Sequence, residues 1–339
     1  MTRLVECVPN FSEGRDIRIV NAIAGAIGAV PGAKLLSVEP DGDYNRTVVT
    51  FIAPPEAAVQ AAFAGTAAAS EMIDMRVHAG GHPRIGATDV VPFVPLQGVT
   101  MADCVALAQG YGRRVGDELG IPVYLYEAAA ARPERRNLAS IRKGEYEGLE
   151  AKLRDPAWAP DFGPAVFNPR SGATVAGARV FLIAYNVNLD TADVAIANEI
   201  ALRIRESGRV KKDQAGNPVL DAQGKKVTIP GTLRAVKAMG VLLETHGIAQ
   251  VSINLVDFTV TPPHVAFDEV ARQAATLGVK ATGSEIVGLT PREALLAAGR
   301  HYAPSVRDDE LLIAEAVSRL GLSQLDRFDP KKKVIEYQL

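Results

Sequence analysis

Residues 76–95 read RVHAGGHPRIGATDVVPFVP, a loop rich in glycine and charge that runs directly into an apolar strand. His82 stands between Gly81 and Pro83, so the backbone is permissive on one side and fixed in φ on the other. A histidine on such a loop, at the mouth of a strand, has room for a ligand and titrates near neutral pH. The residues alone leave two interpretations open, a catalytic proton carrier and an idle surface loop.

The strand in this stretch completes an order of elements that occurs twice along the chain. Hydrophobic periodicity and turn residues predict strand, helix, strand, strand, helix and strand in the first half, at residues 4–9, 17–30, 33–39, 47–52, 55–73 and 90–95. They predict the same order in the second half, at residues 179–186, 190–206, 233–244, 250–259, 265–277 and 279–287. The repetition lies in the order of the elements and not in the residues.

This β-α-β-β-α-β order is ferredoxin-like and belongs to the α/β (α+β) class. It places helices on one face of a mixed or antiparallel sheet and leaves the other face bare. We therefore predict two subdomains, residues 1–178 and 179–300, with sheets stacked face to face, and a helical C-terminal tail at residues 301–339.

Three further segments extend the first half or interrupt the second. A helix at residues 101–119 and a strand at 121–126 follow the loop, and residues 209–227 are typical of an exposed hairpin insertion. Residues 158–173 are rich in Pro, Gly and aromatic side chains and form a long irregular loop. This loop is either a ligand site, whose rings stack on a flat ligand, or an anchored linker between subdomains.

Composition narrows the class of protein. The 339 residues are 47% hydrophobic with a net charge of −2, which favours a globular protein and argues against a nucleic-acid partner. Two distant cysteines argue against a disulfide framework or a structural zinc site. The N-terminus resembles no signal peptide, and no apolar run suggests a membrane span, so we expect a cytoplasmic protein. Motifs for nucleotide binding, serine hydrolysis and zinc proteolysis are not found.

The polar residues around His82 are the candidates for chemistry. His78 lies four residues before it, but the intervening glycines make a helical metal pair a minority interpretation, and we expect no metal. Arg84, beside His82, is either a bidentate ligand for a carboxylate or a solvated loop charge. Asp89 could orient a histidine, or cap a turn. Asp41 has a local turn role, whereas Arg46, at the start of a strand, is less easily explained that way.

Four long stretches of the chain resemble the glutamate formimidoyltransferase family: LVECVPNFSEGR (residues 4–15), HAGGHPRIGATDVVPFVP (78–95), DFGPAVFNPRSGATVAGARVFLIAYNVNL (161–189) and VSINLVDF (251–258). The resemblance extends to about Gly299 and concerns the formimidoyltransferase portion, without the cyclodeaminase of the bifunctional animal enzymes. It implies two stacked α/β subdomains and a homodimer. Two departures from the animal members are Ser171, where they carry tryptophan, and the insertion at residues 209–227.

The resemblance also implies an activity and a site. The family transfers a formimidoyl group from N-formimidoyl-L-glutamate to N5 of tetrahydrofolate, a co-substrate, in histidine degradation. Its catalytic histidine corresponds to His82. Arg46 and Arg84 are candidates to hold substrate carboxylates, and Asp41 or Asp89 to favour the amidinium carbon. Its folate-binding segment corresponds to Gly163, Pro164, Ala165, Val166, Phe167, Asn168, Pro169, Arg170, Ser171 and Gly172. The alternatives are a related folate-dependent transfer from formyl-glutamate and a folate-binding protein without turnover.

Overall fold

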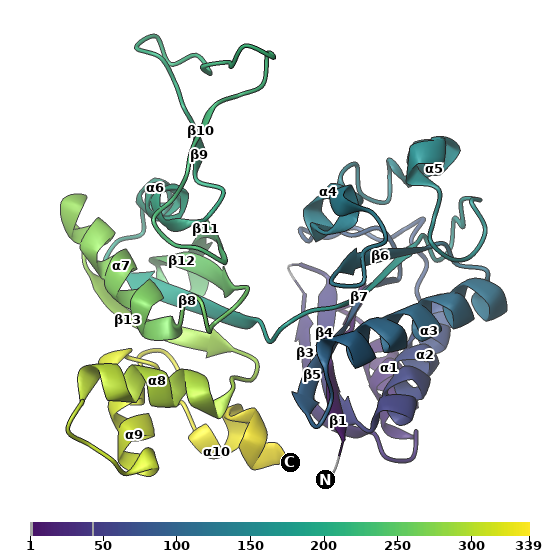
Figure 1. Cartoon of the computed structure of the whole chain (residues 1–339), viewed down its shortest axis with the longest axis horizontal. Helices are drawn as coiled ribbons and strands as arrows, with labels where there is room; N and C mark the ends of the chain where they lie inside the picture. Colours follow the sequence, from purple (N-terminus) through teal and green to yellow (C-terminus); the bar gives the residue numbers. More distant parts are fainter. Residues whose placement is uncertain (1–2, 43) are drawn as a thin grey trace. The chain divides into compact units, whose positions relative to one another are not determined.

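The computed structural model describes residues 3–42 and 44–339 and divides into two compact units, Met1–Val180 (unit 1) and Phe181–Leu339 (unit 2). Each unit has its own sheet, as Figure 1 shows. The predicted α/β class with ferredoxin-like order is confirmed in both units. The face-to-face stacking of the two sheets stays a prediction.

Unit 1 begins with the predicted order of elements and then continues it. Its strands are β1 (Leu4–Cys7), β2 (Asn10–Phe11), β3 (Lys34–Asp41), β4 (Arg46–Ala53), β5 (Thr88–Gln97), β6 (Val123–Glu127) and β7 (Thr174–Ala178). Its helices are α1 (Ile17–Gly28), α2 (Pro55–Met72), α3 (Met101–Leu119), α4 (Leu138–Arg142) and α5 (Leu149–Arg154), with 3₁₀ turns at Pro133–Arg135 and Pro156–Trp158.

The helices of unit 1 begin where the sequence supplies capping groups. Asp16 is the N-cap of α1, and its carboxylate accepts a hydrogen bond from the Arg18 amide. Thr100 and Asp103 form a reciprocal capping box at the start of α3. Gly120, at φ +63°, ends α3 in the left-handed conformation. Local chemistry therefore explains why these helix boundaries were predicted within a few residues.

The sheet of unit 1 contains a ferredoxin-like core and a parallel extension. Strands β1 and β2 both lie between β4 and β5, and β3 pairs with β4, all antiparallel. Strands β7 and β6 then add to the β5 edge in parallel. The sequence did not predict β7, because three of its five residues, TVAGA, are Ala or Gly. A Cβ on Gly177 would lie 2.3 Å from the Tyr126 ring, so a small residue lets these strands pack closely.

Both faces of this extension are covered, which corrects the prediction of a bare face. Helices α1, α2 and α3 pack on one face of the sheet (Figure 1). On the other face, Tyr124 and Val175 belong to a separate small core with Ile141 of α4 and Leu149 of α5. Tyr124 and Tyr126 are both buried. The period of two along a strand sends alternate side chains to the two faces, and here both sets are apolar.

Unit 2 has a four-stranded sheet that is antiparallel throughout, in the order β11-β12-β8-β13. Its strands are β8 (Ile183–Leu189), β11 (Val236–Leu243), β12 (Ile248–Leu255) and β13 (Ala281–Val287), and its helices are α6 (Val194–Ile204), α7 (Pro263–Thr276), α8 (Arg292–Tyr302), α9 (Asp309–Arg319) and α10 (Pro330–Lys333), with 3₁₀ turns at Glu244–His246 and Ile335–Gln338. The helical tail is confirmed, and its residues Leu312, Ile313 and Val334 belong to the main core of unit 2.

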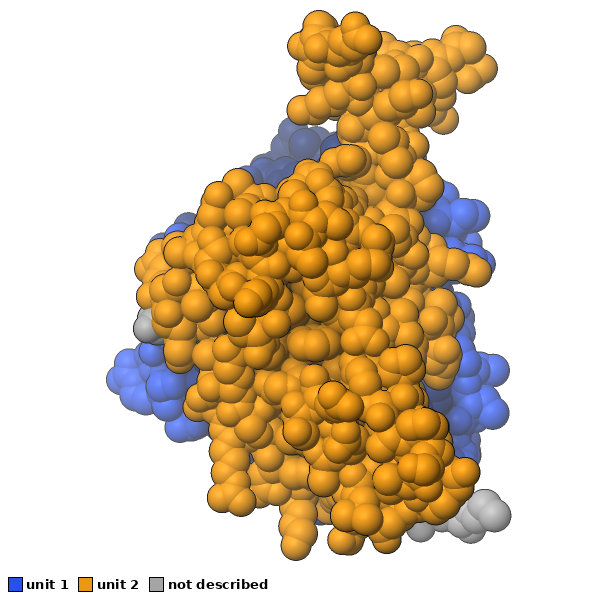
Figure 2. Space-filling model, turned by 90° about the vertical axis from the view of Figure 1, so that its left-hand side faces the viewer, with its two compact units in different colours: residues 1–180 blue, residues 181–339 orange. Residues whose placement is uncertain are grey.

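The predicted hairpin insertion is confirmed as an arm of unit 2, residues 209–229. Strands β9 (Arg209–Val210) and β10 (Thr228–Ile229) pair at its base. Figure 2 shows the arm standing out from the surface of unit 2. Along the part of the chain that the structure describes, no helix combines the length and apolar character needed to cross a membrane.

Candidate active site

The histidine loop, residues 73–87 between α2 and β5, is fixed at its C-terminal end by hydrogen bonds to Ser12 and to residues 171–173. The Ser12 hydroxyl donates to the Gly86 carbonyl at 2.7 Å. The Ala173 amide donates to the Ile85 carbonyl at 3.0 Å, and the Ala87 amide donates to the Ser171 carbonyl at 2.9 Å. A Cβ on Gly86 would lie 2.2 Å from the Ala173 carbonyl oxygen, so only glycine permits this approach. The loop and the predicted folate segment therefore meet at residues 85–87 and 171–173.

The turn before β4 fixes the middle of the histidine loop. The Asn45 side chain accepts a hydrogen bond from the Gly14 amide at 3.0 Å and donates to the Ala79 carbonyl at 3.0 Å. Asn45 has φ +49°, a conformation that asparagine tolerates better than most residues. Gly80 packs so closely that an added Cβ would lie 2.3 Å from the Tyr44 carbonyl oxygen. The stretch around Gly14, the turn and the loop thus form one continuous wall.

His82 is half-buried in this wall and is surrounded by positive charge. The Tyr44 ring meets its imidazole edge-on, with centroids 6.4 Å apart. Burial, followed by the charges of Arg46, Arg142 and Arg84, lowers the pKa of His82 from 6.5 to about 3. The imidazole is therefore neutral at physiological pH and able to accept a proton.

Two of these arginines have unused hydrogen-bond donors. The Nε atoms of Arg46 and Arg142 are buried and have no hydrogen-bond partner within residues 3–42 and 44–339. Arg142 forms an ion pair with Asp89, a carboxylate that is 1% exposed and also accepts from the Ile85 amide at 2.9 Å. Buried polar groups are usually paired, so Arg46 and Arg142 are the candidates for contact with an anionic group such as a substrate carboxylate.

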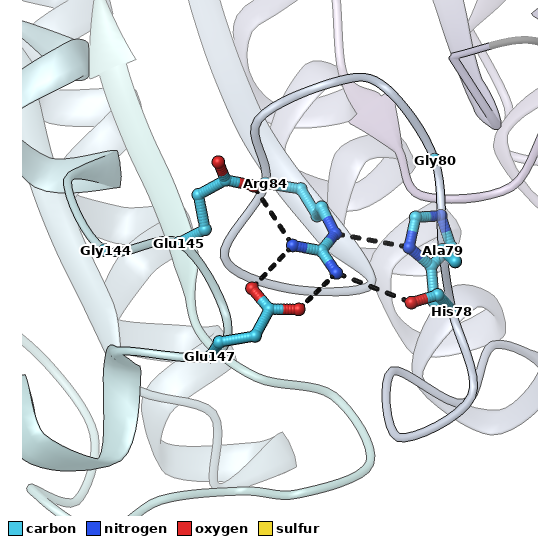
Figure 3. Close-up of a pocket in the computed structure, with 7 residues that line it drawn as sticks. All are labelled: His78, Ala79, Gly80, Arg84, Gly144, Glu145 and Glu147. Carbon is cyan, nitrogen blue, oxygen red and sulfur yellow. Dashed lines mark hydrogen bonds and ion pairs between the residues drawn. The ribbon is translucent and has the colours of Figure 1, made fainter.

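Arg84, by contrast, is occupied by the protein itself, as Figure 3 shows. Its side chain is 8% exposed and forms ion pairs with Glu147 at 2.7 Å and with Glu145 at 3.1 Å. Its Nε donates to His78 Nδ1 at 3.3 Å, and His78 Nε2 faces the Asn45 carbonyl at 3.0 Å. The Arg84 contacts border a cavity of about 420 Å³, which is lined by His78, Ala79, Gly80, Arg84, Gly144, Glu145 and Glu147. These contacts favour a positioning role for Arg84 over direct contact with a substrate.

The predicted folate segment, residues 163–172, is an exposed loop that is fixed at both ends. Gly163 at φ +77° and Gly172 at φ +68° pack closely against the carbonyl groups of Ile121 and Ile85. These two glycines therefore allow the segment to approach other parts of the backbone. The Phe167 ring packs against Tyr146, with centroids 5.4 Å apart. Between these anchors residues 163–166 are exposed, including Val166 at 66%.

The structure therefore gathers some of the predicted site residues and adds others. His82, Arg46, Arg84 and Asp89 share one region of unit 1, whereas the Asp41 carboxylate accepts the Tyr44 amide inside its own turn. Sequence reasoning missed Arg142, Glu145 and Glu147, because a run of charges resembles a solvated surface. No group of three or more His, Cys, Asp or Glu side chains that could hold a metal ion occurs in the described part of the chain.

The fold and the site together define an α/β protein with a neutral histidine set among arginines, as suits proton transfer on an anionic substrate. Two family models match the chain in succession, the formiminotransferase domain, N-terminal subdomain, over residues 4–179, and the formiminotransferase domain over residues 184–339. The chain belongs to the formiminotransferase domain family, which confirms the resemblance inferred from its motifs.

Curated relatives agree with this assignment. The glutamate formimidoyltransferase of Thermoplasma acidophilum is 48% identical over 88% of this chain and 92% of its own length. That of Streptococcus pyogenes is 41% identical over 89% of this chain and 94% of its own. The rat formimidoyltransferase-cyclodeaminase is 47% identical over 99% of this chain. The match spans only 60% of the length of the rat protein.

Proposed function

We propose that the protein transfers the formimidoyl group of N-formimidoyl-L-glutamate to N5 of tetrahydrofolate, giving 5-formimidoyltetrahydrofolate and L-glutamate. The observation that carries the proposal is the neutral His82 beside two arginines with orphaned donors, on a loop bonded to residues 171–173. The names of the two microbial relatives support the same reaction. A cytoplasmic homodimer stays a prediction from the family resemblance.

In the proposed reaction His82 moves one proton between two nitrogens. N5 attacks the formimidoyl carbon, a C–N5 bond forms, and neutral His82 accepts the N5 proton. The bond from that carbon to the glutamate nitrogen then breaks, and the imidazolium returns the proton to the departing amine. General acid–base catalysis of this kind contributes roughly 10²–10⁴-fold to a rate. Holding the two substrates together supplies a further large part of the acceleration.

The arginines link donor binding to the basicity of His82. We assign the donor carboxylates to Arg46 and Arg142, whose Nε donors are orphaned, and the alignment of the imidazole loop to Arg84. Bound carboxylates would offset the positive charge that lowers the pKa of His82. The histidine would then become a stronger base once the donor is in place.

The decisive experiment mixes the protein with tetrahydrofolate and N-formimidoyl-L-glutamate and follows the 5-formimidoyl product. Turnover with this donor, and at least about tenfold lower kcat/KM with N-formyl-L-glutamate, is the expected result. The reverse preference would assign the chain to formyl transfer. Binding of tetrahydrofolate without turnover of either donor would leave a folate-binding protein and contradict the proposal.

A further inference from the structure

The connection between α4 and α5, residues 143–148, forms a closed turn that we call the strap. The Gly148 amide donates to the Gly144 carbonyl at 2.8 Å, and a Cβ on Gly148 would lie at the same distance from that oxygen. Between these glycines Glu145 has φ +54°. The left-handed region costs a residue with a Cβ about 1–2 kcal/mol, so the surrounding contacts must hold Glu145 there.

The strap contacts two segments that carry the proposed chemistry. Glu145 and Glu147, which flank Tyr146, both pair with Arg84 on the histidine loop. The Tyr146 hydroxyl donates to the Pro169 carbonyl at 2.6 Å, and its ring packs on Phe167 in the folate segment. Three consecutive residues therefore bridge the loop of the proposed base and the proposed folate segment.

The two sets of contacts differ in strength. Arg84 donates to the Glu147 carboxylate from both terminal nitrogens, Nη1 at 2.8 Å and Nη2 at 2.7 Å, and this pairing lowers the pKa of the Glu147 carboxyl and raises that of Arg84. The fork is therefore charged at neutral pH. The Tyr146 hydrogen bond lies on an exposed loop and has a neutral acceptor, so it can be removed at modest cost. The ion pairs with Arg84 hold the strap on the histidine loop more strongly than the Tyr146 hydrogen bond holds it on the folate segment.

We propose that Tyr146 is a positioning residue for tetrahydrofolate, which it aligns by fixing residues 167–169 relative to the histidine loop, to which Glu145 and Glu147 hold the strap through Arg84. The inference rests on the proposed function, because it takes residues 163–172 as the folate segment. It assigns a role to a tyrosine that need not touch either substrate. A device of this kind acts on the acceptor and leaves the donor contacts of Arg46 and Arg142 unchanged.

The test compares Tyr146→Phe, Glu147→Gln and the double variant with wild type in steady-state transfer. Tyr146→Phe should raise the KM for tetrahydrofolate about fivefold, the size expected for one hydrogen bond, and leave the KM for the donor and kcat within about twofold. Tyr111→Phe, which removes a buried hydroxyl bonded to Thr66 at 2.7 Å, is the matched control and should change neither KM. The double variant should lose less than the product of the two single losses.

Hydrogen–deuterium exchange gives a second readout that does not depend on turnover. Peptides covering residues 163–172 should exchange faster in Tyr146→Phe and in Glu147→Gln than in wild type or Tyr111→Phe. Unchanged exchange there, or an equal rise in both KM values, would overturn the positioning role. Absence of transfer by the wild-type protein would instead contradict the proposed function, while the exchange data would still decide whether the strap orders the segment.

Discussion

Units 1 and 2 share one framework but lengthen different connections of it. In unit 1 the histidine loop, residues 73–87, joins α2 to β5. The corresponding connection of unit 2, between α7 and β13, is residues 277–280. Between the first strand and the first helix, unit 1 has residues 8–16, including β2, and unit 2 has residues 190–193. Unit 2 instead expands the connection after its first helix into the arm. The two long connections of unit 1 meet where Ser12 contacts Gly86, which places the candidate chemistry at one end of its sheet.

The largest expected effect is the loss of kcat on replacing His82 of the histidine loop, compared with replacing His301 of α8. His82→Gln should lower kcat about 10²–10⁴-fold, because no other group at that position can carry the proton, and should retain tetrahydrofolate binding. His301→Gln, in unit 2, removes a half-exposed imidazole that faces Asp268 at 3.2 Å and should leave kcat within about twofold. Steady-state rates and equilibrium binding of tetrahydrofolate provide the measurement.

The opposite result would break the comparison. If His82→Gln kept the wild-type rate, the histidine loop would not supply the base. His78→Gln adds a test within the loop, because His78 contacts Arg84 and Asn45 and should be much less sensitive than His82. A loss equal to that of His82→Gln would indicate that the two histidines act as a pair.

The framework could be predicted from sequence because its signals are local. Periodicity and capping residues such as Asp16 and Thr100 mark each helix, and the order of elements then gives the sheet. Strand β7 lacks a pattern of alternating residues, and three of its five residues are Ala or Gly, so its contacts with β5 and β6 identify it. Small residues form a strand there because tertiary packing decides the outcome.

Only the part of the candidate site that has a local sequence signal could be predicted. His82 stands in an unusual local sequence, flanked by glycine and proline, so it could be singled out. Arg142 and Glu147 stand in a charged run and acquire their roles only through Asp89 and Arg84, which lie more than fifty positions away along the chain. Long-range ion pairs have no periodic signature, and charge alone more often indicates solvent exposure.

An intermediate effect is expected from Arg46→Gln, which sharpens the electrostatic side of the comparison. Removing this cation should raise the KM for the donor about 10- to 100-fold if Arg46 binds a carboxylate. Arg46 is also the first of the charges that lower the pKa of His82 after burial itself. In substrate-free Arg46→Gln the pKa of His82 should therefore rise from about 3. It should stay below its ordinary value, because burial and the other two arginines still lower it.

The sign of this shift is measurable in two ways. A pH titration of the His82 imidazole by NMR gives the pKa directly. The free energy of unfolding gives it indirectly, because the unfolded chain binds a proton near pH 6.5 and folded His82 does so only near pH 3, so wild type loses stability as the pH falls through this window. Arg46→Gln should lose less between pH 7 and pH 5 than wild type. An unchanged or steeper loss would show that Arg46 does not act on His82.

The smallest effect is expected from the long connection of unit 2. Residues 211–227 of the arm are exposed except for half-buried Val219 and Val227, and their turns are braced internally by the Asp213 and Asp221 carboxylates. Replacing residues 211–227 with Asn-Gly would join β9 to β10 through a two-residue hairpin turn and keep the ion pair of Arg209 with Glu199 at 2.7 Å.

Because the arm buries little surface and loop length affects stability only weakly, the shortened protein should unfold within about 2 °C of wild type. Its kcat and both KM values should stay within about twofold of wild type, as for surface changes away from a site. Differential scanning calorimetry and the transfer assay provide the measurements. Unchanged unfolding together with a tenfold loss of kcat/KM would mean that unit 2, like unit 1, uses a lengthened connection for function, and the contrast between the two units would no longer hold.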